Sequence, residues 1–300
     1  MLIALQSIRG RIFFTMPLTN APQLQLFALV QIVYGVASIF NLFDTCSILT
    51  GASCSDPEIF LLSIVGTFLF VIGIGFFALT IIAYDDTAKK KRLAFAAMYC
   101  VSAQTASAIL AGRTPSGVMP APMHLAEVSV QITLFLILST ANWGDVSLSG
   151  RDNPVGGGAT KIFSALYALF LLTWVFVNAD ALEHVHRDVF ETSEKSNAYV
   201  YHFLSQSISV YAFEMFILFG FGAMYGRHDD NDFLSRLAIL QNICFTLQVF
   251  WFEDVANICA KILRICGIQT CVVAACGLLA ICVDRKKRRN DYESLGGLVR

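Results

Sequence analysis

The chain has 300 residues, of which 56% are hydrophobic and only 14% are charged, and its mean hydropathy is +0.64. A soluble domain carries about a quarter charged residues, so this chain has too little polar surface to cover a globule in water. The composition excludes a soluble protein and indicates lipid as the main solvent. The net charge of −1 gives no reason to expect a nucleic acid partner.

Residues 1–23 precede the first long apolar run and contain Arg9 and Arg11 but no acidic residue. We expect a cytoplasmic amphipathic segment that rests on the membrane surface. A basic, amphipathic transit segment for an organelle is the alternative.

Eight stretches are long and apolar enough to be membrane-spanning helices, which need about 20 mostly apolar residues. In chain order they are roughly residues 24–43, 60–84, 92–112, 124–141, 161–179, 200–225, 233–252 and 267–283. With short connections they use nearly the whole chain, so we expect no separate soluble domain and no cleavable signal.

A pattern of residues occurs twice, 144 positions apart. Seven of 20 aligned positions are identical: Asp85-Asp86, Arg92-Leu93-Ala94, Cys100 and Gln104 recur as Asp229-Asp230, Arg236-Leu237-Ala238, Cys244 and Gln248. We therefore predict four-helix repeats at 24–141 and 161–283, a cytoplasmic linker at 142–160 and a tail at 284–300. Because four is even, both copies insert the same way up. The expected fold class is an all-α integral membrane protein with eight transmembrane helices, arranged as two parallel-oriented four-helix repeats.

The basic residues predict the orientation. If the amino terminus is cytoplasmic, 16 of the 21 Lys and Arg residues fall on the cytoplasmic side, and only Arg113, Arg187, Lys195, Lys261 and Arg264 fall outside. Positive charge resists translocation, so both termini are predicted to be cytoplasmic. We expect the plasma membrane or an endomembrane rather than the inner membrane of an organelle.

Glu214 lies near the middle of the sixth span. A charged side chain at that depth costs about 2.5–3.5 kcal/mol on insertion scales, so it needs a partner or a role. One interpretation is a carboxylate that couples protons or cations in a cavity between the copies. The other is a structural carboxyl bonded to Gln241, Asn242 or Gln248 on the next helix.

Gln104 and Gln248 occupy equivalent deep positions in the third and seventh spans. A buried amide must find partners. The two side chains would either meet at the interface between the copies or bond within their own bundles.

Other candidate sites lie near the ends of the spans. Cys46 and Cys54 share the first outer loop, where a disulfide forms if that side is oxidising. Cys282 next to the basic tail is a candidate for S-palmitoylation. The tail segment Tyr292-Glu-Ser-Leu295 has the form of a tyrosine-based sorting signal that adaptor proteins read. The tail also carries five cations that favour an anionic inner leaflet: Arg285, Lys286, Lys287, Arg288 and Arg289.

These features favour a non-enzymatic protein of tandem tetraspan type that organises lipids or partner membrane proteins. The alternative is a secondary transporter or channel with its path between the repeats and Glu214 as the coupling residue. The histidines lie at span ends or in loops, and no phosphate-binding glycine loop or nucleophile elbow is present, so we expect no enzyme, metal or cofactor. In topology alone, two tandem four-helix units with cytoplasmic termini resemble double-MARVEL tetraspan proteins. The oligomeric state does not follow from these patterns.

Overall fold

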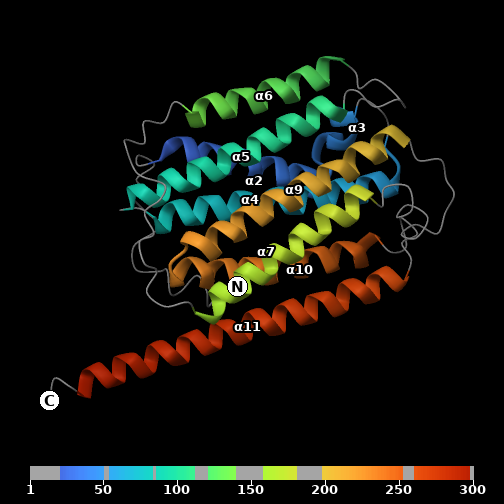
Figure 1. The fold of residues 1–300 in the computed structure, drawn as a ribbon. Helices are drawn as coiled ribbons and strands as arrows, with labels where there is room; N and C mark the ends of the chain where they lie inside the picture. Colours follow the sequence, from blue (N-terminus) through green and yellow to red (C-terminus); the bar gives the residue numbers. More distant parts are fainter. Residues whose placement is uncertain are drawn as a thin grey trace.

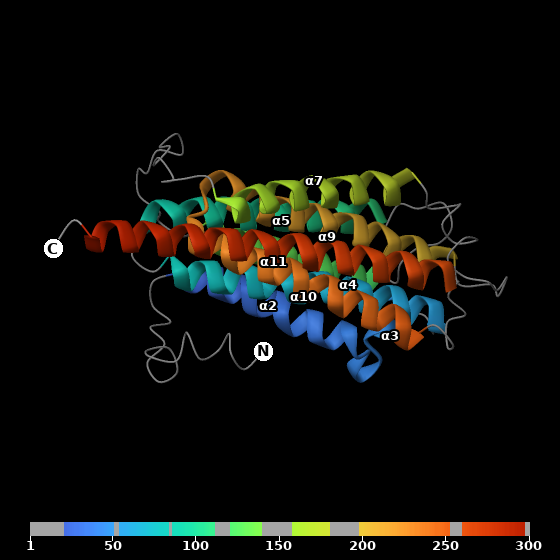
Figure 2. The ribbon, with the colours of Figure 1, turned by 90° about the horizontal axis from the view of Figure 1, so that it is seen from below.

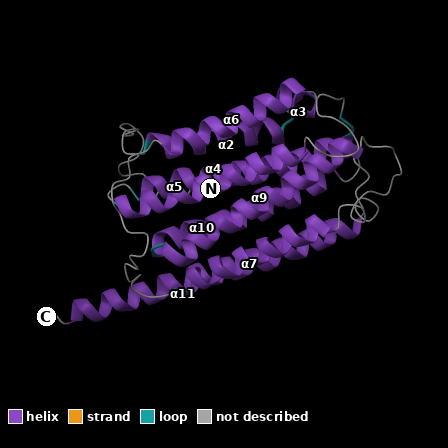
Figure 3. Ribbon diagram, turned by 45° about the horizontal axis from the view of Figure 1, so that its top comes forward, coloured by secondary structure: helices purple, strands orange, loops and turns teal. Residues whose placement is uncertain are grey.

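The computed structural model describes residues 21–50, 54–83, 86–111, 121–139, 158–180, 198–252 and 260–297. Every regular element in these ranges is a helix (Figures 1 and 3), which confirms the predicted all-α class. The two short elements are η1 (Leu42–Asp44) and α3 (Thr45–Thr50). The long helices are α2 (Pro22–Ile39), α4 (Asp56–Ile82), α5 (Thr87–Ala111), α6 (Ala121–Ser139), α7 (Ala159–Asp180), α9 (Ala198–Tyr225), α10 (His228–Phe252) and α11 (Ala260–Gly297).

Each long helix covers one of the apolar stretches expected from the sequence. Among the described residues, five helices are long and apolar enough to cross a membrane: α2, α4, α9, α10 and α11. Shorter apolar helical stretches are Val128–Ser139 in α6 and Ala159–Val175 in α7. Length and composition thus support five spans, compared with the eight predicted.

Consecutive long helices run in alternating directions (Figures 1 and 2). The amino end of α2 and the carboxyl end of α11 consequently lie at the same end of the bundle. We call this the tail end. The amino ends of α5, α7 and α10 also lie there.

The helices α4 and α9 form the centre of the bundle. In the first half of the chain (α2–α6), α2 packs on α4 and α5 packs on α6; in the second half (α7–α11), α7 packs on α9 and α10 packs on α11. The halves also exchange contacts, because α5 packs on α9 and α10 packs on α4.

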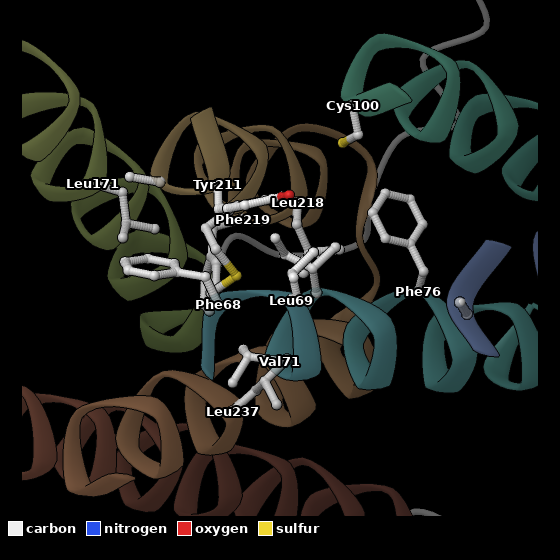
Figure 4. Packing of buried hydrophobic residues seen from close by; sticks show 14 of the residues in the cluster. Phe68, Leu69, Val71, Phe76, Cys100, Leu171, Tyr211, Leu218, Phe219 and Leu237 are labelled. Carbon is white, nitrogen blue, oxygen red and sulfur yellow. The ribbon is translucent and has the colours of Figure 1, made fainter. Parts of the chain in front are cut away.

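Side chains of α4 fill the middle of this core. Figure 4 shows Phe68 and Leu69 among residues of α9 such as Phe219, while Val71 meets Leu237 of α10. All five are buried or nearly so. Such close packing supplies the association between helices where apolar burial gives little driving force.

Glycines let α2 and α4 approach each other closely. A Cβ added at Gly35 would lie 2.5 Å from the backbone nitrogen of Phe70, and one added at Gly66 would lie 2.6 Å from that of Ile39. A Cβ at Gly73 would lie 2.7 Å from the carbonyl oxygen of Ala28. These backbones can touch only because no side chain stands between them.

The helix starts are set by acidic side chains. The backbone nitrogen of Ser55 donates to the Glu58 carboxylate at 2.7 Å in a capping box at the start of α4. The cap of α7 comes from a distant residue: Asp284 of α11 accepts from the backbone nitrogens of Ala159 at 2.7 Å and Thr160 at 3.0 Å. These two bonds join α11, near the tail end, to the start of α7.

Helix α11 lies at the edge of the bundle and is the least covered of the candidate spans, with only 22% of its most apolar window buried. Its outer face exposes large apolar residues such as Ile268 and Leu279, at 66% and 65%. The helix continues through the basic residues 285–289 as far as Gly297. The described part of the predicted tail thus continues α11 as a helix.

Candidate functional site

Glu214 is fully buried in α9 and belongs to a row of polar side chains that crosses three helices. Gln104 of α5 donates from Nε2 to Oε2 of Glu214 at 3.0 Å, and Gln31 of α2 donates from Nε2 to Oε1 of Gln104 at 3.4 Å. All three side chains are buried. We call these three residues the carboxyl–amide row.

The row gives Glu214 a partner from the first half of the chain. The partners expected from the sequence, Gln241, Asn242 and Gln248, are wrong, because α9 turns this carboxyl toward α5 rather than toward α10. The second carboxyl oxygen, Oε1, has no hydrogen-bond partner among the described residues.

Gln248 occupies the corresponding place in the other junction between the halves. Its Nε2 donates to the carbonyl oxygen of Ser63 at 2.9 Å and to Oγ1 of Thr67 at 2.6 Å, both on α4. Gln104 and Gln248 therefore do not meet each other. Each bonds to the central helix of the opposite half. Neither expectation from the sequence, a direct contact between the two side chains or bonds within their own bundles, describes this arrangement.

Asn242 belongs to a second polar group, formed with the buried Tyr167 and Gln241 and the partly buried Gln269. The Tyr167 hydroxyl donates to Oε1 of Gln241 at 2.9 Å and accepts from Nδ2 of Asn242 at 2.8 Å. Nε2 of Gln269 donates to Oδ1 of Asn242 at 2.9 Å. We call these four residues the tyrosine–amide cluster.

A hollow lies against the tyrosine–amide cluster, enclosed by α4, α7, α10 and α11. The cavity inside it is only about 20 Å³, which is enough for a water-sized molecule. Apart from Tyr167, its aromatic walls are Phe68, Phe170, Trp174 and Phe245. The residues that line it carry no formal charge.

Sequence reasoning missed this cluster. The adjacent amides Gln241 and Asn242 in an apolar helix, together with Gln269 in the last span, were a signal that polar groups gather there. The position of Tyr167 was not foreseeable, since α7 is apolar on most of its surface and no period marks its inner face.

Ion pairs join the halves at the tail end, and they use the repeated acidic residues. Nζ of Lys89 lies 2.5 Å from the Asp230 carboxylate, and this pair is buried. In the reciprocal direction Arg227 bonds Asp86 at 3.1 Å, at a more exposed place. Asp86 and Asp230, which occupy matching positions in the repeated pattern, thus each pair with a base of the other half.

The tail end of α11 joins the same network. Arg288 bonds Asp229 at 3.0 Å, and Nε2 of His228 lies 3.6 Å from Asp284. Arg288 therefore forms an ion pair within the protein, which limits its availability to lipid headgroups. Arg285, Lys286, Lys287 and Arg289 are on the same helix and are exposed.

The remaining candidate residues lie at the periphery. Cys46 and Cys54 are joined by a disulfide bond, with their Cα atoms 6.1 Å apart. Cys282 is a free, exposed cysteine on α11. The backbones of Tyr292 and Leu295 belong to the last turns of α11, and their side chains lie outside the described part. Most of the predicted amphipathic segment 1–23 and linker 142–160 also fall outside it.

Among the described residues, no group of three or more His, Cys, Asp or Glu side chains has the arrangement of a metal site. Comparison of the chain with protein-family models, curated proteins and solved structures finds no match. The assignment of function consequently depends on the geometry alone.

Proposed function

We propose that this chain is a multi-pass membrane protein with eight spans, built from two four-helix halves that insert the same way up. The correspondence of contacts supports this proposal: α2 with α4 matches α7 with α9, α5 with α6 matches α10 with α11, and α5 with α9 matches α10 with α4. Repeated Gln104 and Gln248 serve corresponding junctions. The common position of the α2 and α11 ends supports cytoplasmic placement of both termini.

Within that architecture, the protein is non-enzymatic and organises membrane lipids or partner proteins. The observation that carries this proposal is the combination on α11 of an exposed apolar face with four exposed cations at its tail end. The apolar face presents itself to lipid chains or to another helix, while each cation near the inner leaflet contributes about 1 kcal/mol of attraction to anionic headgroups. The buried polar groups of the spans, in contrast, mostly bond to each other.

The experiment is lipid enrichment around the reconstituted protein. Energy transfer from labelled protein to fluorescent phosphatidylserine is compared for wild type and a variant with Arg285, Lys286, Lys287 and Arg289 changed to Gln. Arg288 stays, because it bonds Asp229. We expect the variant to lose most of its enrichment and Arg264→Gln, an exposed cation near the other end of α11, to keep it. Equal enrichment by all three proteins would contradict the proposal.

The second candidate function is a transporter or channel with Glu214 as a coupling residue. The specific observation in its favour is that Oε1 of this carboxyl, buried at a junction between the halves, finds no hydrogen-bond partner in the part of the chain that the structure describes. Glu214→Gln keeps an acceptor for Gln104 but removes the titrating group. Proton- or cation-dependent flux in proteoliposomes that Glu214→Gln abolishes would establish transport; unchanged flux, or none in wild type, leaves Glu214 as a structural residue.

A further inference from the structure

The hollow between α4, α7, α10 and α11 is small, and polar side chains reach it from several helices. Its cavity of about 20 Å³ exceeds the roughly 10–15 Å³ that a single water molecule requires. Thr67 of α4, Gln241 of α10 and Gln269 of α11 are among the residues that line it. A cavity holds an ordered water when it has this space and offers two to four polar partners. Size and lining together therefore favour water as the ligand.

The amides in the lining retain unused hydrogen-bonding capacity. Gln241 accepts from the Tyr167 hydroxyl through Oε1, and its amide nitrogen has no partner in the described ranges. Gln269 donates from Nε2 to Asn242, and its amide oxygen has no partner among the same residues. Leaving a buried amide group unpaired costs free energy. A water that accepts from Gln241 and donates to Gln269 would satisfy both groups.

Thr67 provides a third partner, and it belongs to the first half of the chain. Its hydroxyl donates to the carbonyl oxygen of Ser63 at 3.2 Å and accepts from Nε2 of Gln248 at 2.6 Å. A hydroxyl oxygen can accept two hydrogen bonds, so one acceptor site remains. Together with Gln241 and Gln269 this makes about three partners, the usual number for a buried water.

The lining also disfavours other classes of ligand. The residues around the hollow carry no formal charge, and an ion placed there would cost much more than a neutral molecule. Trp174 and Phe245 meet edge to face with centroids 6.0 Å apart, which closes part of the wall. A lipid or a drug-sized molecule has no room in the cavity. Water is the occupant that both size and charge allow.

We propose that this hollow binds an ordered water molecule that bridges the two halves of the protein. The water accepts from the Gln241 nitrogen and donates to the Gln269 oxygen and the Thr67 hydroxyl. Gln248 joins α10 to α4 directly through the same hydroxyl, and the water adds a link from it to α10 and α11. This inference goes beyond the proposed function and does not depend on it, because it concerns how the halves are held together.

The test is radiolytic labelling of the full-length protein in nanodiscs, in water enriched in the heavy oxygen isotope. A short X-ray pulse splits bound water into hydroxyl radicals that oxidise adjacent side chains, and mass spectrometry of peptides locates the heavy oxygen. Phe68 lines the hollow, whereas Phe76 lies elsewhere on the same helix, and both are buried. We expect Phe68 to be oxidised and Phe76 to remain at the level of the unirradiated sample. Equal oxidation of the two would overturn the proposal.

A radical scavenger in the bulk solvent distinguishes an ordered water from solvent that merely enters the hollow. The scavenger should suppress oxidation of Lys286, which is exposed on the tail. Oxidation of Phe68 should persist, because the radical forms inside the protein next to the ring. Suppression at both residues would refute an ordered water.

Three variants test the polar partners and the space. Gln269→Met keeps similar bulk but removes the acceptor, and it should lower the oxidation of Phe68 to that of Phe76. Leu171→Phe should occupy the cavity and have the same effect, whereas Leu166→Phe on the exposed face of α7 should match wild type. Unchanged oxidation of Phe68 in Gln269→Met or in Leu171→Phe would refute the bridge. If these variants fail to fold, the comparison of Phe68 with Phe76 in the wild-type protein decides.

Discussion

Replacing Gly66 with Ala tests whether the close approach of α2 and α4 holds the first half together. The added Cβ would lie 2.6 Å from the Ile39 nitrogen and 2.7 Å from the Gly35 oxygen. Both are backbone atoms, so no side chain can turn away. Ordinary contact distances would return only if the helices separated by roughly 0.8 Å.

Gly220→Ala in α9 is the matched control, because a Cβ at that position meets nothing within 4 Å. Both substitutions gain about 1 kcal/mol of helix propensity, so this contribution cancels in the comparison. Overpacking costs about 1–3 kcal/mol, and we expect Gly66→Ala to be less stable than Gly220→Ala by that amount.

Unfolding is induced by adding SDS to the protein in mixed micelles and is monitored by tryptophan fluorescence. The SDS fraction at the midpoint of unfolding is determined for each variant. Gly66→Ala should unfold at a lower SDS fraction than wild type, and Gly220→Ala at the same or a higher one. If the two variants unfold together, the helices are not held at backbone contact and the reasoning is refuted.

Two further substitutions, Lys89→Met and Cys46→Ser, probe the ends of the bundle, with Lys287→Met as a control for the first. Lys89→Met should destabilise the protein by about 3–5 kcal/mol, since it leaves Asp230 buried without its cationic partner. Lys287→Met on the exposed tail should change the SDS midpoint little. Similar midpoints for the two variants would argue against a buried pair. Cys46 and Cys54 should resist maleimide-polyethylene glycol without reductant and react after reduction, and Cys46→Ser should cost about 2–3 kcal/mol through loss of the closed loop. Modification of Cys54 in the unreduced wild-type protein would show that the bond does not form.

The sequence predicted the helices well because long apolar runs have few alternatives in lipid, where a backbone must satisfy its own hydrogen bonds. It predicted poorly which face of each helix contacts which neighbouring helix. The contact of Gln104 with Glu214 joins residues 110 positions apart, and α9 is apolar on nearly every side, so no periodicity marks which face carries the partner. The continuation of α11 through its charged end was missed for a related reason, since Lys and Arg are good helix formers.

Asp86 and Asp230 occupy matching positions in the repeated sequence pattern, but the pattern does not predict which residues they pair with. Local sequence indicates that each acid begins a helix, as Asp86 does by accepting from the Lys89 nitrogen at 2.9 Å. That Asp230 also pairs with Lys89 of the first half depends on how the halves are placed against each other. Such long-range pairing has no signature in spacing.

The exchange of contacts between the halves has a consequence for biosynthesis. Helices α5 and α4 are synthesised before the α9 and α10 surfaces on which they pack. Until the carboxyl-terminal half is inserted, Gln104 lacks its carboxyl partner and Lys89 lacks its counterion. The first half of the nascent chain is therefore not fully packed at this stage. A chain cut between α6 and α7 would keep these contacts. Two fragments that correspond to the halves and are synthesised separately should therefore associate.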